Sequence, residues 1–141
     1  MERAIPPLTD EETALWRGFL AWSDDVRADV ERAVTTATGL SMAEFVVLIR
    51  LDDGGTPQRD LQEGLRWSAT RLSHQLARME ERGWIARRSS GSGRAVDVAI
   101  TASGAAVLAA AMEPHAAAVR SAFLAPMTGA QRAVLRSMLG G

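Results

Sequence analysis

One stretch of the chain carries arginine, histidine and glutamine at the spacing of a helix face. Within SATRLSHQLARMEER these polar side chains stand at positions i, i+3, i+4, i+7 and i+11: Arg71, His74, Gln75, Arg78 and Arg82. A helix turns about 100° per residue, so these positions share one face. Arginine can pair with O6 and N7 of guanine or with phosphates, and glutamine with N6 and N7 of adenine. The pattern predicts a helix face that contacts DNA.

Apolar residues of the same stretch predict a second face, roughly 130° around the helix, that packs on a core: Ala69, Leu72, Leu76 and Met79. A simpler alternative exists for part of the polar face. Arg78 and Arg82 could pair with Glu81 and other acids on a hydrated surface. We adopt that alternative for Arg82, and we favour DNA contact for Arg71 and the first turn.

Hydroxyl groups and further arginines extend the predicted contact surface. Ser68 and Thr70 fall in the first turn of the helix, where free N–H groups meet a phosphate or a base edge. Three more arginines flank the serine- and glycine-rich residues 89–93. The predicted DNA-contacting residues are Ser68, Thr70, Arg71, His74, Gln75, Arg78, Arg87, Arg88 and Arg94.

The charge of the chain is unevenly distributed. All 16 basic residues are arginine, and 17 acids bring the net charge to −1. Residues 56–94 hold eight arginines and four acids, a net charge of +4, while the rest of the chain has −5. Two interpretations explain this asymmetry equally well: a local anion-binding surface, or a hydrated charged face with no partner.

Several classes of function are excluded or disfavoured by what the chain lacks. Without cysteine there is no disulfide, cysteine nucleophile or thiolate metal site, and two histidines far apart make a poor metal site. No catalytic acid–base pair and no glycine-rich phosphate loop are apparent. We therefore expect no enzyme, no catalytic residue, no metal and no cofactor. With no apolar run of about eighteen residues and no signal peptide, we expect a cytoplasmic protein that does not contact membranes.

Cap and stop residues predict the helices that position these side chains. Ser41 and Glu44 form a capping-box signature, and DDGG at 52–55 ends the helix that follows. Thr56 is predicted to cap a third helix with Pro57 at its first position. A turn of about three residues then leads to a fourth helix, which Ser68 caps and Gly83 ends. The third and fourth helices, joined by this short turn, make a helix-turn-helix.

A β-hairpin and long terminal helices complete the predicted fold. Trp84 and Ile85 begin one strand, and alternating residues from Val96 to Ile100 form the other, giving a wing over 84–101. The fold class is mainly α with a small β-hairpin wing (α+β). A first helix over 10–37 carries an apolar stripe about six turns long, too long for one small domain to cover, so a partner surface is expected. The stripe comprises Leu15, Phe19, Trp22, Val26, Val30 and Ala33.

Taken together, the chain resembles the MarR family of transcriptional regulators over about residues 10–139. The most specific part begins with S-x-T-x-L-S-x-x-L-x-R-M-E-x-x-G at 68–83. A basic wing follows, and a hydrophobe-Thr-x-x-Gly closure ends it at Ile100, Thr101 and Gly104. No single piece is decisive, but their order and spacing together are specific.

The resemblance implies a homodimer that binds double-stranded DNA. Residues 1–141 would form a single domain, with dimerisation helices at 10–37 and 102–141 and a winged helix-turn-helix lobe at 41–101. Two recognition helices would enter successive major grooves of a near-palindromic operator, and the protein would act as a repressor. A small aromatic or anionic ligand would release it. Candidate ligand-lining residues, for which a core or interface role is the simpler alternative, are Trp16, Trp22, Phe45 and His115.

One position departs from the family pattern. Ser92 stands where the wing usually carries an aspartate, while Arg94 keeps the position of the arginine that reaches the minor groove. We expect Arg94 to keep this role on a more mobile wing, with Asp97 as a substitute partner. A winged-helix protein-interaction module without DNA binding is the alternative function, and the salt dependence of DNA binding distinguishes the two.

Overall fold

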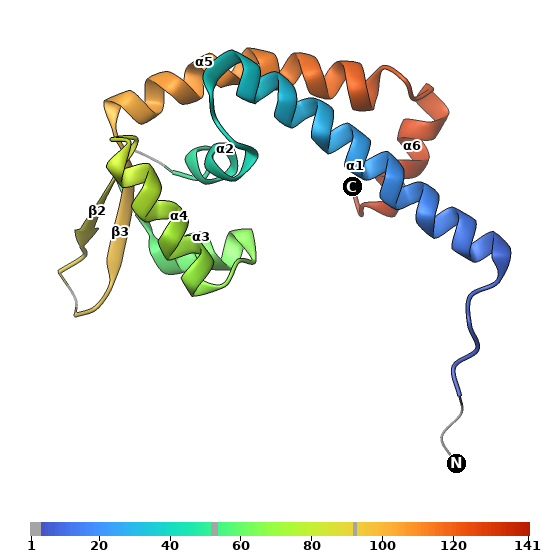
Figure 1. Ribbon diagram of the computed structural model, residues 1–141, viewed down its shortest axis with the longest axis horizontal. Helices are drawn as coiled ribbons and strands as arrows, with labels where there is room; N and C mark the ends of the chain where they lie inside the picture. The colour runs from blue at the N-terminus through green and yellow to red at the C-terminus, as the bar shows by residue number, and fades with distance from the viewer. Residues whose placement is uncertain (1–3, 52–53, 92) are drawn as a thin grey trace. The chain divides into compact units, whose positions relative to one another are not determined.

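A computed structural model describes residues 4–51, 54–91 and 93–141 as helices with one small antiparallel sheet (Figure 1). The elements in chain order are α1 (Asp10–Thr38), α2 (Met42–Leu48), β1 (Thr56–Pro57), α3 (Gln58–Leu65), α4 (Ala69–Glu81), β2 (Ile85–Ser89), β3 (Val96–Ile100), α5 (Ala102–Val119), the π-helical turn η1 (Arg120–Leu124) and α6 (Gly129–Met138). The predicted fold class is confirmed. Within the described residues, no helix is long and apolar enough to span a bilayer.

Two compact units make up the chain. The first contains residues 1–30 and 118–141, and the second contains residues 31–117. The boundaries fall inside α1 and α5, so each of these helices contributes to both units. The second unit holds all three strands together with α2, α3 and α4.

The hydrophobic core of the second unit packs around α4. Leu72, Leu76 and Met79 are fully buried, as their helical spacing predicts. Ala69 is exposed instead, because it lies in the first turn of α4, ahead of the part that packs on the core. The other core residues are Val34, Leu40, Phe45, Val47, Leu48, Leu61, Ile85, Val98 and Ala111.

The predicted caps form at the starts of α2 and α4. Ser41 Oγ accepts a hydrogen bond from the Glu44 backbone N–H at 3.1 Å, and Glu44 Oε1 accepts one from the Ser41 N–H at 2.9 Å. Ser68 Oγ likewise accepts from the Arg71 N–H at 3.1 Å. Each bond satisfies an N–H group that has no partner inside its helix.

The predicted cap at Thr56 is wrong. Thr56 and Pro57 form a third strand that pairs with β3, with Thr56 opposite Val98 and Pro57 opposite Asp97. The helix begins one residue later than predicted, at Gln58, without a side-chain cap. The sheet order is therefore β1-β3-β2. The prediction fails because pairing of Thr56 and Pro57 with a distant strand overrides the local signal for a helix start.

Thr101 joins the end of α4, the wing and the start of α5. Its Oγ1 donates to the Gly83 carbonyl oxygen at 2.6 Å and accepts from the Gly104 N–H at 3.0 Å. Its own backbone N–H donates to the Trp84 carbonyl oxygen at 3.0 Å. Gly104 is buried against this junction.

Replacing Gly104 with alanine should destabilise the protein. A Cβ there would overlap the Trp84 carbonyl oxygen and lie 2.9 Å from Ile100 Cγ1. We expect a loss of about 1–3 kcal/mol in the free energy of unfolding, measured by urea denaturation. The control is Gly129→Ala, where nothing lies within 4 Å; its free energy of unfolding should stay within about 0.5 kcal/mol of the wild-type value. Equal stability of the two variants would contradict this account of the junction.

Candidate nucleic-acid interface

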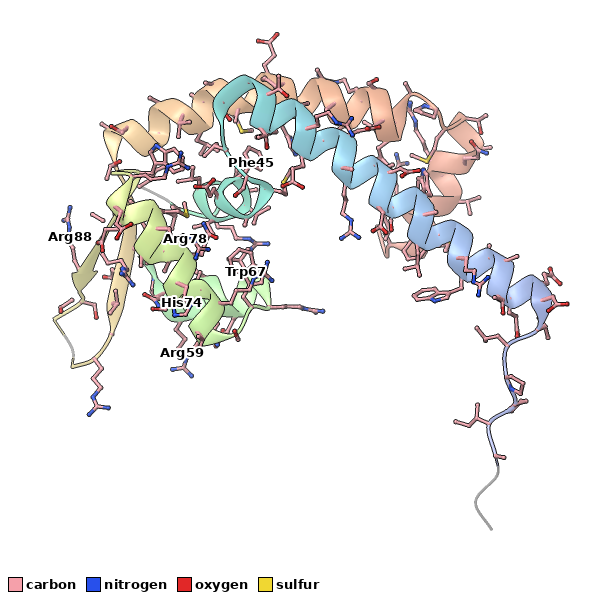
Figure 2. All side chains as sticks on the ribbon, in the orientation of Figure 1. Phe45, Arg59, Trp67, His74, Arg78 and Arg88 are labelled. Carbon is pink, nitrogen blue, oxygen red and sulfur yellow. The ribbon has the colours of Figure 1, made fainter. Side chains whose placement is uncertain are left out.

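One face of α4 exposes the polar side chains that the sequence predicts as DNA contacts. Arg71, His74 and Arg78 are exposed, as are Ser68 and Thr70 at the start of the helix. Figure 2 shows His74 and Arg78 on α4 and Arg88 on the hairpin. The buried leucines of α4 lie on its other side, so packing and solvent exposure divide the helix into two faces.

Arg71 is held against an aromatic ring. Its guanidinium carbon lies 4.0 Å from the centre of the Trp67 ring, which itself packs partly against the core. A cation over an indole face is attracted by the negative potential of the ring. Between α3 and α4 the backbone turns at Arg66, which has a left-handed conformation with φ 57°.

Gln75 does not share the exposed face that its spacing predicts. It is only 7% exposed, and its Oε1 accepts a hydrogen bond from Arg78 Nη2 at 2.8 Å. Gln75 lies about 60° from the middle of the buried face, so the rotation that buries Leu72 and Leu76 encloses it too. In this position the Gln75 side-chain oxygen holds the Arg78 guanidinium.

The predicted hairpin forms. β2 and β3 are antiparallel, with pairs running from Ile85 opposite Ile100 to Ser89 opposite Val96. Arg88 and Arg94 are exposed, and neither has an ion pair within the described part of the chain. The predicted substitution at Ser92 lies outside the described residues. Arg94 and Asp97 do not pair within the described part, so the expected replacement contact is absent there.

Arg87, unlike Arg88 and Arg94, forms an ion pair within the described residues. Its Nη2 lies 3.3 Å from Glu80 Oε1, and its backbone N–H donates to Glu80 Oε2 at 3.0 Å. The side chain is only 25% exposed. Arg87 therefore fastens β2 to α4.

The comparisons with known proteins agree with this geometry. Residues 40–96 match the model of the MarR family. The matched residues run from α2 to the start of β3 and so include the helix-turn-helix. The chain is similar to Sco3205 of Streptomyces coelicolor, a MarR family transcriptional regulator solved in complex with DNA, at 25% identity and a TM-score of 0.88. That match covers 98% of this chain and 89% of the other.

Two further structures have a similar fold. AbsC, a MarR family transcriptional regulator of Streptomyces coelicolor, is 27% identical with a TM-score of 0.87, covering 96% of this chain and 93% of its own. A single-residue mutant of MarR from Escherichia coli, solved with operator DNA, has a TM-score of 0.77 at 20% identity, covering 96% and 97%. Among curated protein sequences, none matches this chain significantly.

In the second unit an ion pair ties the end of α4 to α2. Arg82 Nη1 lies 3.1 Å from Glu44 Oε2, with the Glu44 side chain 9% exposed and that of Arg82 53% exposed. Arg82 also lies over the Trp84 ring, 4.3 Å from its centre. The expectation that Arg82 pairs with an acid is confirmed, although the partner is Glu44 and not the neighbouring Glu81.

A polar groove beside the wing was not predicted from the sequence. It has a volume of about 490 Å³ and is lined by residues of β1, α3 and the start of β3, including Gln58, Arg59, Gln62 and Arg94. Arg59 Nε lies 3.6 Å from Glu63 Oε1, and the Arg59 side chain is well exposed. The net positive charge of residues 56–94 is the one sequence signal that includes Arg59.

Two of the four residues predicted to line a ligand site lie in the first unit and two in the second. Trp16 stacks on Phe19, and Trp22 lies 5.8 Å from Phe123, all in the first unit. In the second unit, Phe45 is buried in the core and stacks with half-buried His115, with ring centres 4.7 Å apart. No group of three or more potential metal-ligating side chains gathers among the residues described.

Removing the Glu44–Arg82 pair should loosen α4 from α2. In a double-mutant cycle of Glu44→Gln and Arg82→Gln, we expect a coupling of about 1 kcal/mol in the free energy of unfolding, because Arg82 is half exposed. The coupling should shrink at high salt. A matched cycle on the exposed pair Asp24 and Arg27 should give a smaller value. A coupling near zero for Glu44 and Arg82 would contradict the assigned role.

Proposed function

We propose that this protein is a transcriptional repressor that binds a near-palindromic operator in double-stranded DNA as a homodimer. The observation that carries the proposal is a set of exposed arginines on α4 and the wing that have no acidic partner among the described residues: Arg71, Arg78, Arg88 and Arg94. DNA presents a dense row of negative phosphates, so unpaired arginines on one lobe suit it as a partner. The DNA complex of the similar regulator Sco3205 supports the same function.

The proposal gives each part of the lobe its own contact. α4 enters the major groove with Arg71, His74 and Arg78, and its first turn meets phosphate through Ser68 and Thr70. The wing lies along the backbone, with Arg88 at phosphates and Arg94 toward the minor groove. Gln75 and Arg87, which the structure encloses or pairs, support these contacts from behind.

A second copy of the chain is the proposed partner for the first unit. Large apolar side chains of α1 and α6 are between 39% and 77% exposed there: Leu15, Trp16, Phe19, Leu20, Trp22, Val134, Met138 and Leu139. A groove of about 510 Å³ runs between Trp22 and α6. Monomeric proteins rarely leave a surface of this kind in water, so burial between two copies supports the homodimer.

Release from DNA by a small aromatic or anionic ligand stays a prediction that rests on the family resemblance. Contact between Phe45 and His115 joins two of the four residues predicted to line such a site. The repressor role and action in the cytoplasm belong to the same proposal.

DNA binding should depend steeply on salt. We expect the dissociation constant for DNA selected by the protein to rise with salt as several phosphate contacts are lost. Arg88→Ala should weaken binding and reduce the salt slope by about one, whereas Arg120→Ala, an exposed arginine outside residues 56–94, should leave both unchanged. Fluorescence anisotropy measures both quantities. A flat salt response from folded protein would favour the alternative function, a protein-interaction module.

Charge placed on the apolar face of α6 should separate the two copies. Val134→Glu with Met138→Glu puts two carboxylates on side chains that are 61% and 77% exposed in the single chain. We expect a change from dimer to monomer in sedimentation equilibrium, because carboxylates resist burial in an apolar interface. The matched control is Arg136→Glu, which helical spacing places roughly 160° around α6 from both Val134 and Met138. A wild-type monomer, or an unchanged dimer in the double variant, would contradict the proposed interface.

A further inference from the structure

Two arginines on the exposed face of α4 are already held in place without DNA. Trp67, four residues before Arg71, holds its guanidinium by stacking, with 4.0 Å between the guanidinium carbon and the ring centre. Gln75 holds Arg78 by a hydrogen bond of 2.8 Å, three residues before it. Trp67 packs partly against the core and Gln75 is nearly buried, so each holder is itself fixed.

These contacts leave most of each guanidinium free to bind. Stacking uses the face of the Arg71 group, so its N–H donors stay available in the plane of the group. The hydrogen bond to Gln75 uses only one of the five N–H donors of Arg78. A long arginine side chain normally loses much rotamer freedom on binding, and restraint in the free protein reduces that loss.

Restrained guanidinium groups suit a base edge better than a phosphate. Two parallel N–H groups must meet O6 and N7 of guanine in one plane, which rewards a fixed orientation. A phosphate accepts an arginine from many directions, so a mobile side chain serves equally well. Arg88, the proposed phosphate contact of the wing, fits the second case, because it has no stacking or ion-pair contact within the described residues.

We infer that Trp67 and Gln75 are positioning residues that hold Arg71 and Arg78 for guanine recognition in the major groove, and that they thereby set the sequence preference of the protein. The inference rests on the proposed function. It assigns specificity to two side chains that do not themselves reach DNA.

The other arginine–tryptophan stack in the lobe provides an internal control. Arg82 lies over Trp84 at a similar distance of 4.3 Å, but its guanidinium is committed to Glu44. Trp84→Leu therefore removes a stack of the same type without releasing an arginine that faces DNA. Trp67→Phe retains an aromatic ring and should restore what Trp67→Leu loses.

The test compares specific with non-specific binding. Full-length wild-type protein selects its preferred site from random duplex DNA, and the affinities of each variant for that site and for a scrambled duplex are then measured. For Trp67→Leu we expect a loss of about two- to fivefold on the selected site. Gln75→Leu should give a loss of similar size, and the scrambled duplex should show little loss with either variant. Repeated selection should show a weaker preference for guanine, while the salt slope stays unchanged because the phosphate contacts remain.

Two results would overturn the inference, and they differ in what else they affect. If folded Trp67→Leu and Gln75→Leu keep the wild-type ratio of specific to non-specific affinity, or if Trp84→Leu changes it as much, the positioning role is wrong while the proposed function stands. If wild-type protein selects no sequence, the proposed function fails together with the inference. A lower ratio in both variants, restored by Trp67→Phe, supports the positioning role.

Discussion

The rotation of α4 about its own axis is the constraint on which the candidate interface depends. Burial of Leu72, Leu76 and Met79 fixes that rotation, because turning the helix would expose them to water. The same rotation brings Arg71 and Arg78 to the surface. Contacts at both ends complete the restraint: Ser68 caps the start of the helix, and the end is tied to α2 by an ion pair and to α5 through Thr101.

The arginines of residues 56–94 include some that pair with acids inside the protein and others that are exposed without an acidic partner. Arg82 and Arg87 pair with Glu44 and Glu80, and these pairs hold α2, α4 and β2 together. The exposed arginines of α4 and the wing have no acidic partner among the described residues and remain available to an anion. The Arg87–Glu80 pair cancels within residues 56–94, and Glu44 neutralises Arg82 from outside that range, so the net charge of +4 falls to +3 when Glu44 is counted.

Local features of the sequence predicted most of the fold, and contacts between distant residues account for what it missed. The caps at Ser41 and Ser68, the core face of α4 and the alternation of β3 each depend on neighbouring residues. The pairing of Thr56 with Val98 and the burial of Gln75 depend on tertiary packing, which helical spacing does not contain. Likewise, the acids near Arg82 in the sequence indicated that it would pair with an acid, but they did not indicate Glu44.

Methylation interference on the DNA site that the protein selects tests the central claim most directly. Methyl groups at guanine N7 project into the major groove, where the exposed face of α4 is proposed to bind. The account predicts two clusters of guanines whose methylation blocks binding, centred about 10 base pairs apart, one for each copy of α4. Binding that is insensitive to guanine methylation, or interference confined to adenine N3 in the minor groove, would contradict it.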